Sequence, residues 1–547
     1  MSDGRAEEMF PRLTPEQLER LAKVGRRRDA AAGEVLVEQG AMAREVFVVL
    51  AGTVVTVHRS GAGERLIVTL HAGQFTGELS LLWGRRHLAE NRAATAAEVL
   101  AVSPDALRKI VSTDTDLGDV ILNAYILRRS LLTAAGQGDA VLIGSQHSAG
   151  TLRLREFMSR NNQPCAYLDL DRDPDVQALL ERLGLSAGDV PIVICRGERV
   201  LKNPSNEEVA ERLGWARTLE PGAVRDVVIV GAGPAGLAAA VYGASEGLDT
   251  LALEGNAPGG QAGSSTRIEN YLGFPTGISG QEFANRAYVQ AQKFGAELAI
   301  PRSAVRLRCE RRPYAVELSD GSLIRARAVV VATGVRYRRP ESAGMEKFEG
   351  VGIYYAATPM EAQLCRDEKV LVVGGSNSAG QAAVFLAPRV RQVDILVRGA
   401  GLASTMSRYL VARIEESPNI ALHSHQEIFA AEGDDHLERV QIRDGQTGET
   451  RTLSVRHAFI MTGGDPNTGW LRGSVALDER GFVKTGANLS ADDLAAWPLQ
   501  RTPHLLETSV PGVFAVGDVR AASMKRVASA VGEGSACIQL VHSALAE

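Results

Sequence analysis

The chain has 547 residues, and a typical length of about 150 residues per domain predicts three or four domains. Its formal net charge of −5, with 45% hydrophobic and 23% charged residues, is ordinary for a globular protein and argues against nucleic-acid or anionic-membrane partners. No signal-peptide pattern or membrane-length apolar run occurs, so no membrane segment is expected. The five cysteines form no CxxC pair, which favours free thiols in a reducing cytoplasm, and no metal-ligand cluster is expected.

Residues 1–137 alternate short apolar runs with turns and then become helical. Leu107–Leu132 has helical spacing of apolar residues, and Gly40, Gly52 and Gly73 separate the preceding runs. We therefore expect a small antiparallel β-barrel followed by a helix. The expected strands are Val35–Val37, Val46–Leu50, Thr53–His58 and Leu66–Leu70.

The stretches GEVLVEQG, EVFVVLAGTVVTV and FTGELSLL, followed by RAAT, resemble the cyclic-nucleotide-binding domain of bacterial regulators. That resemblance implies that Gly77 and Glu78 bind a ribose and that the Arg92 guanidinium binds a cyclic phosphate. The stretch between Glu78 and Arg92 is longer than usual, so Arg85 or Arg86 is an alternative phosphate ligand. Cyclic AMP or cyclic GMP is the expected effector, and the alternative is a degenerate barrel that binds nothing.

Residues 138–218 alternate strand and helix patterns in the order βαβαββα, which resembles the thioredoxin and glutaredoxin fold. Pro191 would be the cis-proline of that family. Ser145 and Ser148 occupy the spacing of its redox CxxC, and hydroxyls cannot form a disulfide. We expect a redox-silent docking or spacer domain. Its expected elements are a strand at Ala140–Ile143, a helix at Leu152–Asn161, a strand at Ala166–Leu170, a helix at Asp173–Leu185, a strand from Val190, a hairpin turn at Arg196–Arg199 and a helix at Glu207–Leu213.

The strongest motif begins at Asp226, where an apolar run leads directly into GxGxxG. In such a motif Gly231 makes a tight turn, Gly233 lets the backbone approach a pyrophosphate, and Gly236 lets the helix pack on the strand. The helix that begins at Pro234 and Ala235 would point its N-terminus at the phosphates. The next apolar run ends at Glu254, placed to bind a ribose hydroxyl. This segment is predicted to bind a dinucleotide.

A second strand–glycine unit starts at Lys369. Its following strand, Val393–Val397, ends at Arg398. Two dinucleotide folds in one chain suit hydride transfer between two bound nucleotides. The second nucleotide is expected on Gly374, Gly375, Ser376, Asn377, Ser378, Ala379 and Arg398.

Taken together, these motifs resemble the low-molecular-weight thioredoxin reductase family over residues 225–545. The resemblance implies FAD bound by residues 219–341 and 456–547, and NAD(P)H bound by residues 342–455. NADPH is favoured over NADH because one arginine, Arg398, remains at the strand end, although Gly399 replaces a second. Besides the residues of the first motif, the resemblance assigns to FAD Gly259, Gln261, Asn270, Ala332, Thr333, Gly334, Gly517, Asp518, Lys525, Arg526 and Val527.

The resemblance fails at the redox centre. Where that family carries Cys-Ala-Thr-Cys, this chain reads Ala356-Ala357-Thr358-Pro359, and Cys365 stands alone. Without two thiols there is no internal dithiol relay. We expect an FAD-dependent NAD(P)H oxidoreductase, homodimeric by resemblance, whose electron acceptor the sequence does not name. The alternative is a cyclic-nucleotide-sensing or scaffold flavoprotein with little nicotinamide turnover.

Overall fold

The computed structural model describes residues 3–42, 44–60, 63–77, 86–134, 140–195, 199–215, 219–220, 222–340 and 342–547. The chain forms two compact units. Unit 1 comprises residues 1–146, 153–219 and 292–295, and unit 2 comprises residues 147–152, 220–291 and 296–547. Among the described residues, no helix is long and apolar enough to cross a membrane.

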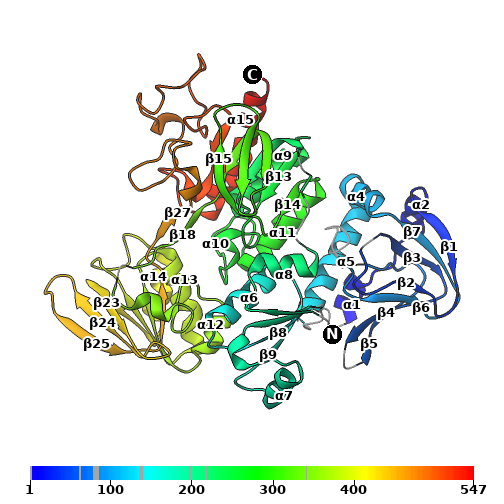
Figure 1. The fold of residues 1–547 in the computed structure, drawn as a ribbon, viewed down its shortest axis with the longest axis horizontal. Coiled ribbons are helices and arrows are strands. Elements are labelled where there is room, and N and C mark those ends of the chain that lie inside the picture. Colours follow the sequence, from blue (N-terminus) through cyan, green and yellow to red (C-terminus); the bar gives the residue numbers. More distant parts are fainter. Residues whose placement is uncertain are drawn as a thin grey trace. The chain divides into compact units, whose positions relative to one another are not determined.

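The first part of unit 1 is an antiparallel barrel of two sheets (Figure 1). Gly40, Gly52 and Gly73 have φ angles of +80°, +78° and +84°, so they make the corners that the sequence predicts. Apolar side chains that include Phe47 and Val99 fill the barrel. One sheet has the order β1 (Arg26–Ala30), β7 (Ala97–Val102), β3 (Val46–Ala51), and the other the order β2 (Val35–Val37), β6 (Glu90–Ala93), β4 (Val54–Ser60), β5 (Gly63–Leu70).

Helices precede and follow this barrel in the sequence. The prediction of a single helix over Leu107–Leu132 is wrong, because two helices occupy this range. The chain breaks at Asp114, whose backbone is extended and whose carboxylate accepts a hydrogen bond from the Leu117 amide at 3.1 Å. An aspartate in this position starts a new helix, because it satisfies a free amide of the first turn. The helices are α1 (Asp3–Met9), α2 (Pro15–Ala22), α4 (Pro104–Thr113) and α5 (Thr115–Ala134).

The second part of unit 1 has the βαβαββα order expected from the sequence. Strands β8 and β9 are parallel, whereas β10 is antiparallel to both β8 and β11. The peptide bond before Pro191 is cis, and Cys195 is buried. The elements are β8 (Ala140–Gly144), α6 (Ala149–Arg160), β9 (Cys165–Asp169), α7 (Pro174–Arg182), β10 (Ile192–Cys195), β11 (Arg199–Lys202) and α8 (Asn206–Leu213), with the sheet order β11-β10-β8-β9.

Unit 2 contains two larger sheets, and each includes the strand that leads into one of the predicted glycine motifs (Figure 1). The first sheet is mixed, because β16 pairs antiparallel with both β15 and β17. In the first sheet, β12 lies between β13 and β17, and β28 adds to β17 in parallel. Helices α9 (Pro234–Ser245), α10 (Gly260–Gly263), α11 (Gly280–Lys293) and α15 (Val527–Leu545) belong to this part. Its strands are β14 (Glu297–Ala299), β13 (Thr250–Leu253), β12 (Val224–Val230), β17 (Leu323–Val331), β16 (Tyr314–Leu318), β15 (Ala304–Arg308) and β28 (Val513–Ala515).

The second sheet is parallel throughout and has β20 near its centre. Helices α12 (Pro359–Leu364), α13 (Asn377–Leu386) and α14 (Arg408–Glu416) accompany it. A two-stranded ribbon of β18 (Val335–Tyr337) and β27 (Gly464–Pro466) and an antiparallel sheet of β23 (Gln426–Glu432), β24 (Arg439–Asp444) and β25 (Thr450–Ser454) complete unit 2. The order of the second sheet is β19 (Ile353–Tyr354), β26 (His457–Ile460), β20 (Lys369–Val373), β21 (Gln392–Leu396), β22 (Ile420–His423).

Candidate functional site

The first glycine loop connects β12 to α9 and leaves no room for a Cβ at its first and last glycines, Gly231 and Gly236. Gly231 has φ +106°, and a Cβ there would lie 2.4 Å from the Ala332 carbonyl oxygen. A Cβ on Gly236 would lie only 1.8 Å from the Gly231 oxygen. Gly233 is the N-cap of α9 and brings no side chain to the free amides of the first turn. This helix N-terminus is therefore open to an anionic group such as a pyrophosphate.

Three neighbouring segments hold this loop in place. The Glu254 carboxylate accepts hydrogen bonds from the Ala232 and Asn256 amides, both at 2.9 Å. The Gly259 amide donates to the Ala232 oxygen at 2.7 Å, and a Cβ on Gly259 would lie 2.3 Å from the Ala284 Cβ. The Gln261 side chain is turned to the Val335 carbonyl at 2.8 Å. The structure thus brings the first predicted motif and the Gly259–Gln261 segment together.

The chain returns to this loop at two further points. Thr333 and Asn467 exchange two hydrogen bonds. The Thr333 hydroxyl donates to the Asn467 backbone oxygen at 2.8 Å, and the Asn467 side-chain amide donates to the Thr333 backbone oxygen at 2.9 Å. Gly334, with φ +61°, accepts from the Asn467 amide nitrogen at 3.1 Å. These bonds fix the crossing between the two sheets beside the Ala332–Gly334 segment.

Asp518 follows β28 and provides the acidic group of this region. Burial raises the pKa of its carboxyl, while the nearby Lys525 ammonium lowers it in part. The Lys525 ammonium donates to the Asp518 backbone oxygen, and the Gly517 amide donates to the Glu533 carboxylate at 2.7 Å. Arg526 is the N-cap of α15 and Val527 its first residue, so the segment from Lys525 opens a second helix at the same place. Asn270, which the sequence resemblance also assigns to FAD, is exposed.

The second glycine loop repeats the first in outline. Gly374 has φ +136°, and a Cβ there would lie 2.3 Å from the Met461 oxygen. Ser376 caps α13 without a side-chain hydrogen bond, so the first-turn amides of this helix are also open. Asn377 is turned away from the helix end, since its side-chain oxygen accepts from the Ser407 amide at 2.7 Å. Ala379 is fully buried, whereas Ser378 is one residue nearer the open end.

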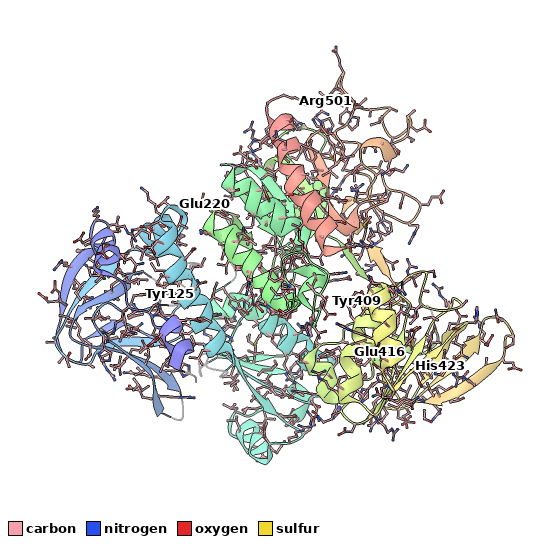
Figure 2. All side chains as sticks on the ribbon, turned by 180° about the vertical axis from the view of Figure 1, so that it is seen from behind. Tyr125, Glu220, Tyr409, Glu416, His423 and Arg501 are labelled. Atoms are coloured by element: carbon pink, nitrogen blue, oxygen red, sulfur yellow. The ribbon has the colours of Figure 1, made fainter. Side chains whose placement is uncertain are left out.

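Arg398 lies beyond the end of β21 and is exposed. Arg408, the first residue of α14, is also exposed, and Figure 2 labels Tyr409 beside it. Next to Arg398, a Cβ on Gly399 would meet no heavy atom closer than 4.0 Å. An exposed arginine with room for another side chain beside it therefore lies at the position where the sequence predicts a 2′-phosphate.

The segment Ala356–Pro359 leads into helix α12, which begins at Pro359. Thr358 is the N-cap of α12 in a capping box with Glu361, whose carboxylate accepts from the Thr358 amide at 2.9 Å. Cys365 follows this helix, is fully buried, and has its thiol pKa raised to about 12, chiefly by burial. All five cysteines lie in the described part of the chain, and none of them forms a disulfide there. At neutral pH the Cys365 thiol is protonated and a poor nucleophile.

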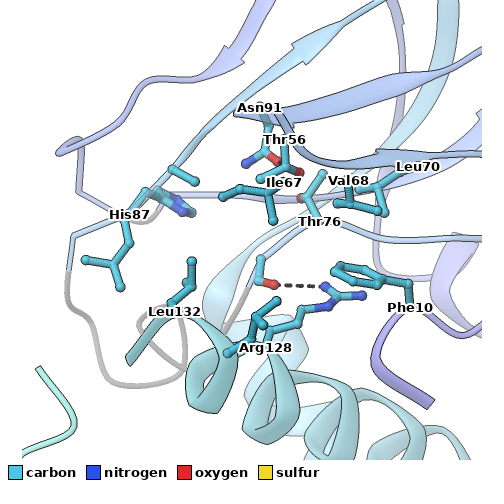
Figure 3. A pocket seen from close by; sticks show the side chains of 14 residues that line it. Phe10, Thr56, Ile67, Val68, Leu70, Thr76, His87, Asn91, Arg128 and Leu132 are labelled. Atoms are coloured by element: carbon cyan, nitrogen blue, oxygen red, sulfur yellow. Dashed lines mark hydrogen bonds between the residues drawn. The ribbon is translucent and has the colours of Figure 1, made fainter. Parts of the chain in front are cut away.

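The barrel of unit 1 holds a pocket (Figure 3). Thr56 and Asn91 lie on one side of it, and Arg128 and Leu132 of α5 lie on the other. Tyr125 of the same helix, labelled in Figure 2, is fully buried and donates to the Thr76 oxygen at 3.1 Å. The remaining lining residues are Phe10, Ile67, Val68, Leu70, Thr76, Gly77, His87, Leu88, Ala89 and Leu131.

Arg92 does not line this pocket, contrary to expectation. Side chains alternate along a strand, and Asn91 of β6 faces the pocket, so Arg92 faces the other way. The Arg92 guanidinium pairs with the Glu64 carboxylate at 2.7 Å and with Glu90 at 3.4 Å. The Arg86 guanidinium donates to the Gly40 oxygen at 2.9 Å. Of the other predicted effector residues, Gly77 lines the pocket, and Glu78 and Arg85 lie outside the described residues.

Sequence reasoning missed Thr56, His87, Asn91 and Arg128 as pocket residues. The sequence signal that could have identified His87 is the unusually long stretch between Glu78 and Arg92. At the usual length of that stretch, the arginine position would move back toward His87, which lines the pocket and is 5% exposed. The motif does not show that Thr56 and Arg128 line the pocket, because this depends on which strand positions and which helix face point inward.

Comparisons with known proteins match the first part of unit 1 and most of unit 2. The family model for pyridine nucleotide-disulphide oxidoreductases matches residues 225–534, and that for cyclic nucleotide-binding domains matches residues 27–114. A thioredoxin reductase of Mycolicibacterium smegmatis is 34% identical over 314 residues, 57% of this chain and 94% of the relative. A thioredoxin reductase of Streptomyces clavuligerus is 33% identical over 312 residues, again 57% of this chain, and 91% of the relative. The crystal structure of Lactococcus lactis thioredoxin reductase, titled as its FR conformation, matches 59% of this chain and 99% of its own with 27% identity and a TM-score of 0.53.

Two dinucleotide folds, each with an open helix N-terminus after a glycine loop, define a pyridine-nucleotide-dependent flavoprotein class. The family match covers more than half of the chain, and the chain belongs to the pyridine nucleotide-disulphide oxidoreductase family. It is an NAD(P)H-dependent flavoprotein oxidoreductase of thioredoxin reductase-like architecture, with an N-terminal cyclic nucleotide-binding domain. The residues around Gly231 and Asp518 fit FAD, because they combine loop glycines without space for a Cβ, uncapped amides and a buried carboxyl.

Proposed function

We propose that this protein oxidises NAD(P)H through bound FAD and delivers the electrons to an acceptor outside its own polypeptide, without an internal disulfide. When bound, FAD supplies two-electron chemistry between a pyridine nucleotide and a second acceptor. The observation that carries the proposal is the capping box at Thr358, which occupies the place where the resembled reductases have their redox cysteines. Cys365, the nearest thiol, is buried and protonated.

The residues of unit 2 have distinct proposed roles. The amides after Gly233 would bind the FAD pyrophosphate, and Asp518 would hydrogen-bond the ribityl chain through its carboxyl. The amides after Ser376 would bind the nicotinamide dinucleotide, and Arg398 would bind a 2′-phosphate. Gly259, Gln261 and the Ala332–Gly334 crossing would position the flavin ring system. NADPH is the proposed electron donor, with NADH as the weaker one.

The test is anaerobic mixing of the FAD-loaded protein with NADPH and, separately, with NADH. Loss of the visible absorbance band of the oxidised flavin within seconds is expected with NADPH. An unchanged spectrum with both nucleotides would favour the alternative, a sensing or scaffold flavoprotein. Mass spectrometry of alkylated protein before and after NADPH is the second readout. An intramolecular cystine that opens on reduction would overturn the proposed route.

The surface beside Arg398 gives a prediction about nucleotide choice. Gly399→Arg should raise the preference for NADPH over NADH about tenfold, because a second guanidinium adds a charge-assisted bond to the 2′-phosphate, worth about 1.5–3 kcal/mol. A Cβ has open space at this position, so the fold should tolerate the change. The ratio of kcat/KM for the two nucleotides measures it. Gly399→Ala is the matched control and should leave the ratio unchanged.

We also propose that the N-terminal domain regulates the oxidoreductase through a small ligand. The helix α5 supports this role. Arg128 and Leu132 line the pocket, whereas Arg129 is 2% exposed and donates to the Asn162 oxygen at 2.7 Å in the following domain. The match to cyclic nucleotide-binding domains makes cyclic AMP and cyclic GMP the first effectors to test in the flavin assay. The following domain is proposed to be a redox-silent thioredoxin-like domain that transmits this signal, and the chain is proposed to be a homodimer by analogy with the resembled reductases.

A further inference from the structure

We infer that Glu269 and Arg413 are positioning residues, whose ion pair couples the two proposed nucleotide sites so that FAD strengthens the binding of the nicotinamide nucleotide. This inference rests on the proposed function, because it concerns how the two sites of that function act on each other. Both residues belong to unit 2. Glu269 lies in the part of unit 2 that is proposed to bind FAD, and Arg413 lies in helix α14 of the part that is proposed to bind NAD(P)H.

The contact between the two side chains is short and partly shielded from water. The Arg413 Nη1 group donates to one Glu269 carboxylate oxygen at 2.6 Å, and the Glu269 side chain is 19% exposed. The other carboxylate oxygen lies 3.5 Å from the Arg267 Nε. The Arg413 guanidinium also lies 5.4 Å from the centre of the Tyr409 ring. A charge-assisted bond between partners that are already held in place is stronger than a typical exposed ion pair.

The chain on the FAD side holds Glu269 from both directions. The preceding residue, Ile268, exchanges two backbone hydrogen bonds with Ile278, at 2.7 and 3.0 Å. Two residues after Glu269, the Tyr271 ring packs edge-on against Phe283 of α11, with the ring centres 5.0 Å apart. The position of the Glu269 carboxylate is therefore tied to helix α11.

Helix α11 continues this connection to the proposed FAD site. Ala284 follows Phe283 in α11 and is buried. A Cβ on Gly259 would lie only 2.3 Å from the Ala284 Cβ, and the Gly259 amide donates to the Ala232 oxygen of the first glycine loop at 2.7 Å. Close-packed contacts transmit displacements because they leave no free volume. FAD bound at this loop should therefore restrict Glu269 as well.

Helix α14 makes the corresponding connection on the NAD(P)H side. Its N-cap residue, Ser407, donates its amide to the side-chain oxygen of Asn377 at 2.7 Å, and Asn377 is the first residue of α13 after the second glycine loop. A Cβ on Gly380 of α13 would lie 2.6 Å from the Met406 Sδ, so the chain entering α14 packs directly on α13. These contacts tie Arg413 to the loop that is proposed to bind the nicotinamide nucleotide.

The ion pair should make the binding of the two nucleotides cooperative. Forming an ion pair costs conformational entropy, and a first ligand that has already ordered one partner removes part of that cost for the second ligand. FAD should therefore lower the Kd of the nicotinamide nucleotide, and by linkage the nicotinamide nucleotide should lower the Kd of FAD by the same factor. A factor of about two to five is expected, which is the effect of one partly exposed ion pair.

The test uses the full-length FAD-loaded protein and NADP⁺, which has no hydride to give. Calorimetry measures the Kd of NADP⁺, and the fluorescence of released FAD measures how far NADP⁺ slows FAD dissociation. Glu269→Gln and Arg413→Gln should each raise the Kd of NADP⁺ about two- to fivefold and abolish the slowing of FAD release. Arg413→Lys, which keeps the charge, should retain most of both effects. The double variant should match either single variant, because both remove the same interaction.

Glu427→Gln is the matched control. It removes the ion pair between Glu427 and Arg443, which are 2.5 Å apart on the paired strands β23 and β24 of the NAD(P)H part. Both readouts should stay at the parental values, and thermal midpoints verify folding. Equal effects of Glu427→Gln and Glu269→Gln, or additive effects of the two substitutions in the double variant, would overturn the inference.

A readout without any nicotinamide nucleotide separates this inference from the proposed function. Amide hydrogen exchange at residues 268–271 of the FAD-loaded protein should be faster in Arg413→Gln than in the parent, and unchanged in Glu427→Gln. Parental exchange in Arg413→Gln would overturn the inference, whether or not NADP⁺ binds. A protein that shows the coupling but whose flavin NADPH does not reduce would contradict the proposed function alone.

Discussion

Replacing Gly236 by valine is expected to give a protein that has lost nearly all of its FAD. The Cβ of the new side chain would lie 1.8 Å from the Gly231 oxygen, and this neighbour is backbone in the loop that is proposed to bind the pyrophosphate. Relieving such a clash costs about 1–3 kcal/mol or more and opens the loop, so FAD affinity should fall at least about tenfold. The ratio of flavin absorbance to protein absorbance after purification measures the loss.

The matched control for this variant is Gly532→Ala in α15 of the same unit. A Cβ on Gly532 meets no atom within 4 Å, so FAD content should be unchanged. Circular dichroism and the thermal midpoint of apo protein separate loss of FAD from loss of folding. A Gly236→Val protein that keeps full flavin content would contradict the assignment of this loop.

Replacing Gly374 by valine should, unlike Gly236→Val, leave FAD bound but slow its reduction by NADPH about hundredfold. Gly374 has φ +136°, which a β-branched residue rarely adopts, and its Cβ would lie 2.3 Å from the Met461 oxygen. Backbone strain of about 1–3 kcal/mol would move the amides that are proposed to bind the nucleotide. Anaerobic rapid mixing over a range of NADPH concentrations gives the rate and the apparent Kd.

Gly399→Ala serves as control here also, since the residue lies in open space in the same part of the chain. It should reduce flavin at the parental rate. Equal rates for parent and Gly374→Val would mean that NADPH binds elsewhere. The two valine variants together separate the two nucleotide sites, because one loses the flavin and the other loses only its reduction.

Sequence patterns were sufficient for the parts of the fold that local chemistry decides. The strand–glycine–helix units at Gly231 and Gly374 need close backbone approach, which only glycine permits, so their spacing alone located both loops. The βαβαββα order of residues 138–218 followed from alternating periodicity and is observed. The segment Ala356–Pro359 contains no cysteine, so the sequence also excluded a thiol pair at this position.

The sequence was insufficient where a single residue position decides direction. Arg92 matches a motif, yet on β6 it lies on the opposite face from Asn91, and a shift of one residue in a strand reverses every side chain. The prediction of one continuous helix missed the break between α4 and α5 for a similar reason. The apolar spacing continues across Asp114, and only the capping hydrogen bond of Asp114 interrupts the helix. The pocket itself combines β4, β5, β6 and α5, which are distant in sequence.

Consecutive residues of α5 face two different environments: Arg128 reaches the pocket wall and Arg129 reaches Asn162. A helix turns by about 100° per residue, so one alanine inserted between them would swing one of these side chains out of place while leaving the helix formed. The composition of α5 can therefore drift, whereas deletion or insertion of a single residue within it would separate the pocket wall from the contact with Asn162.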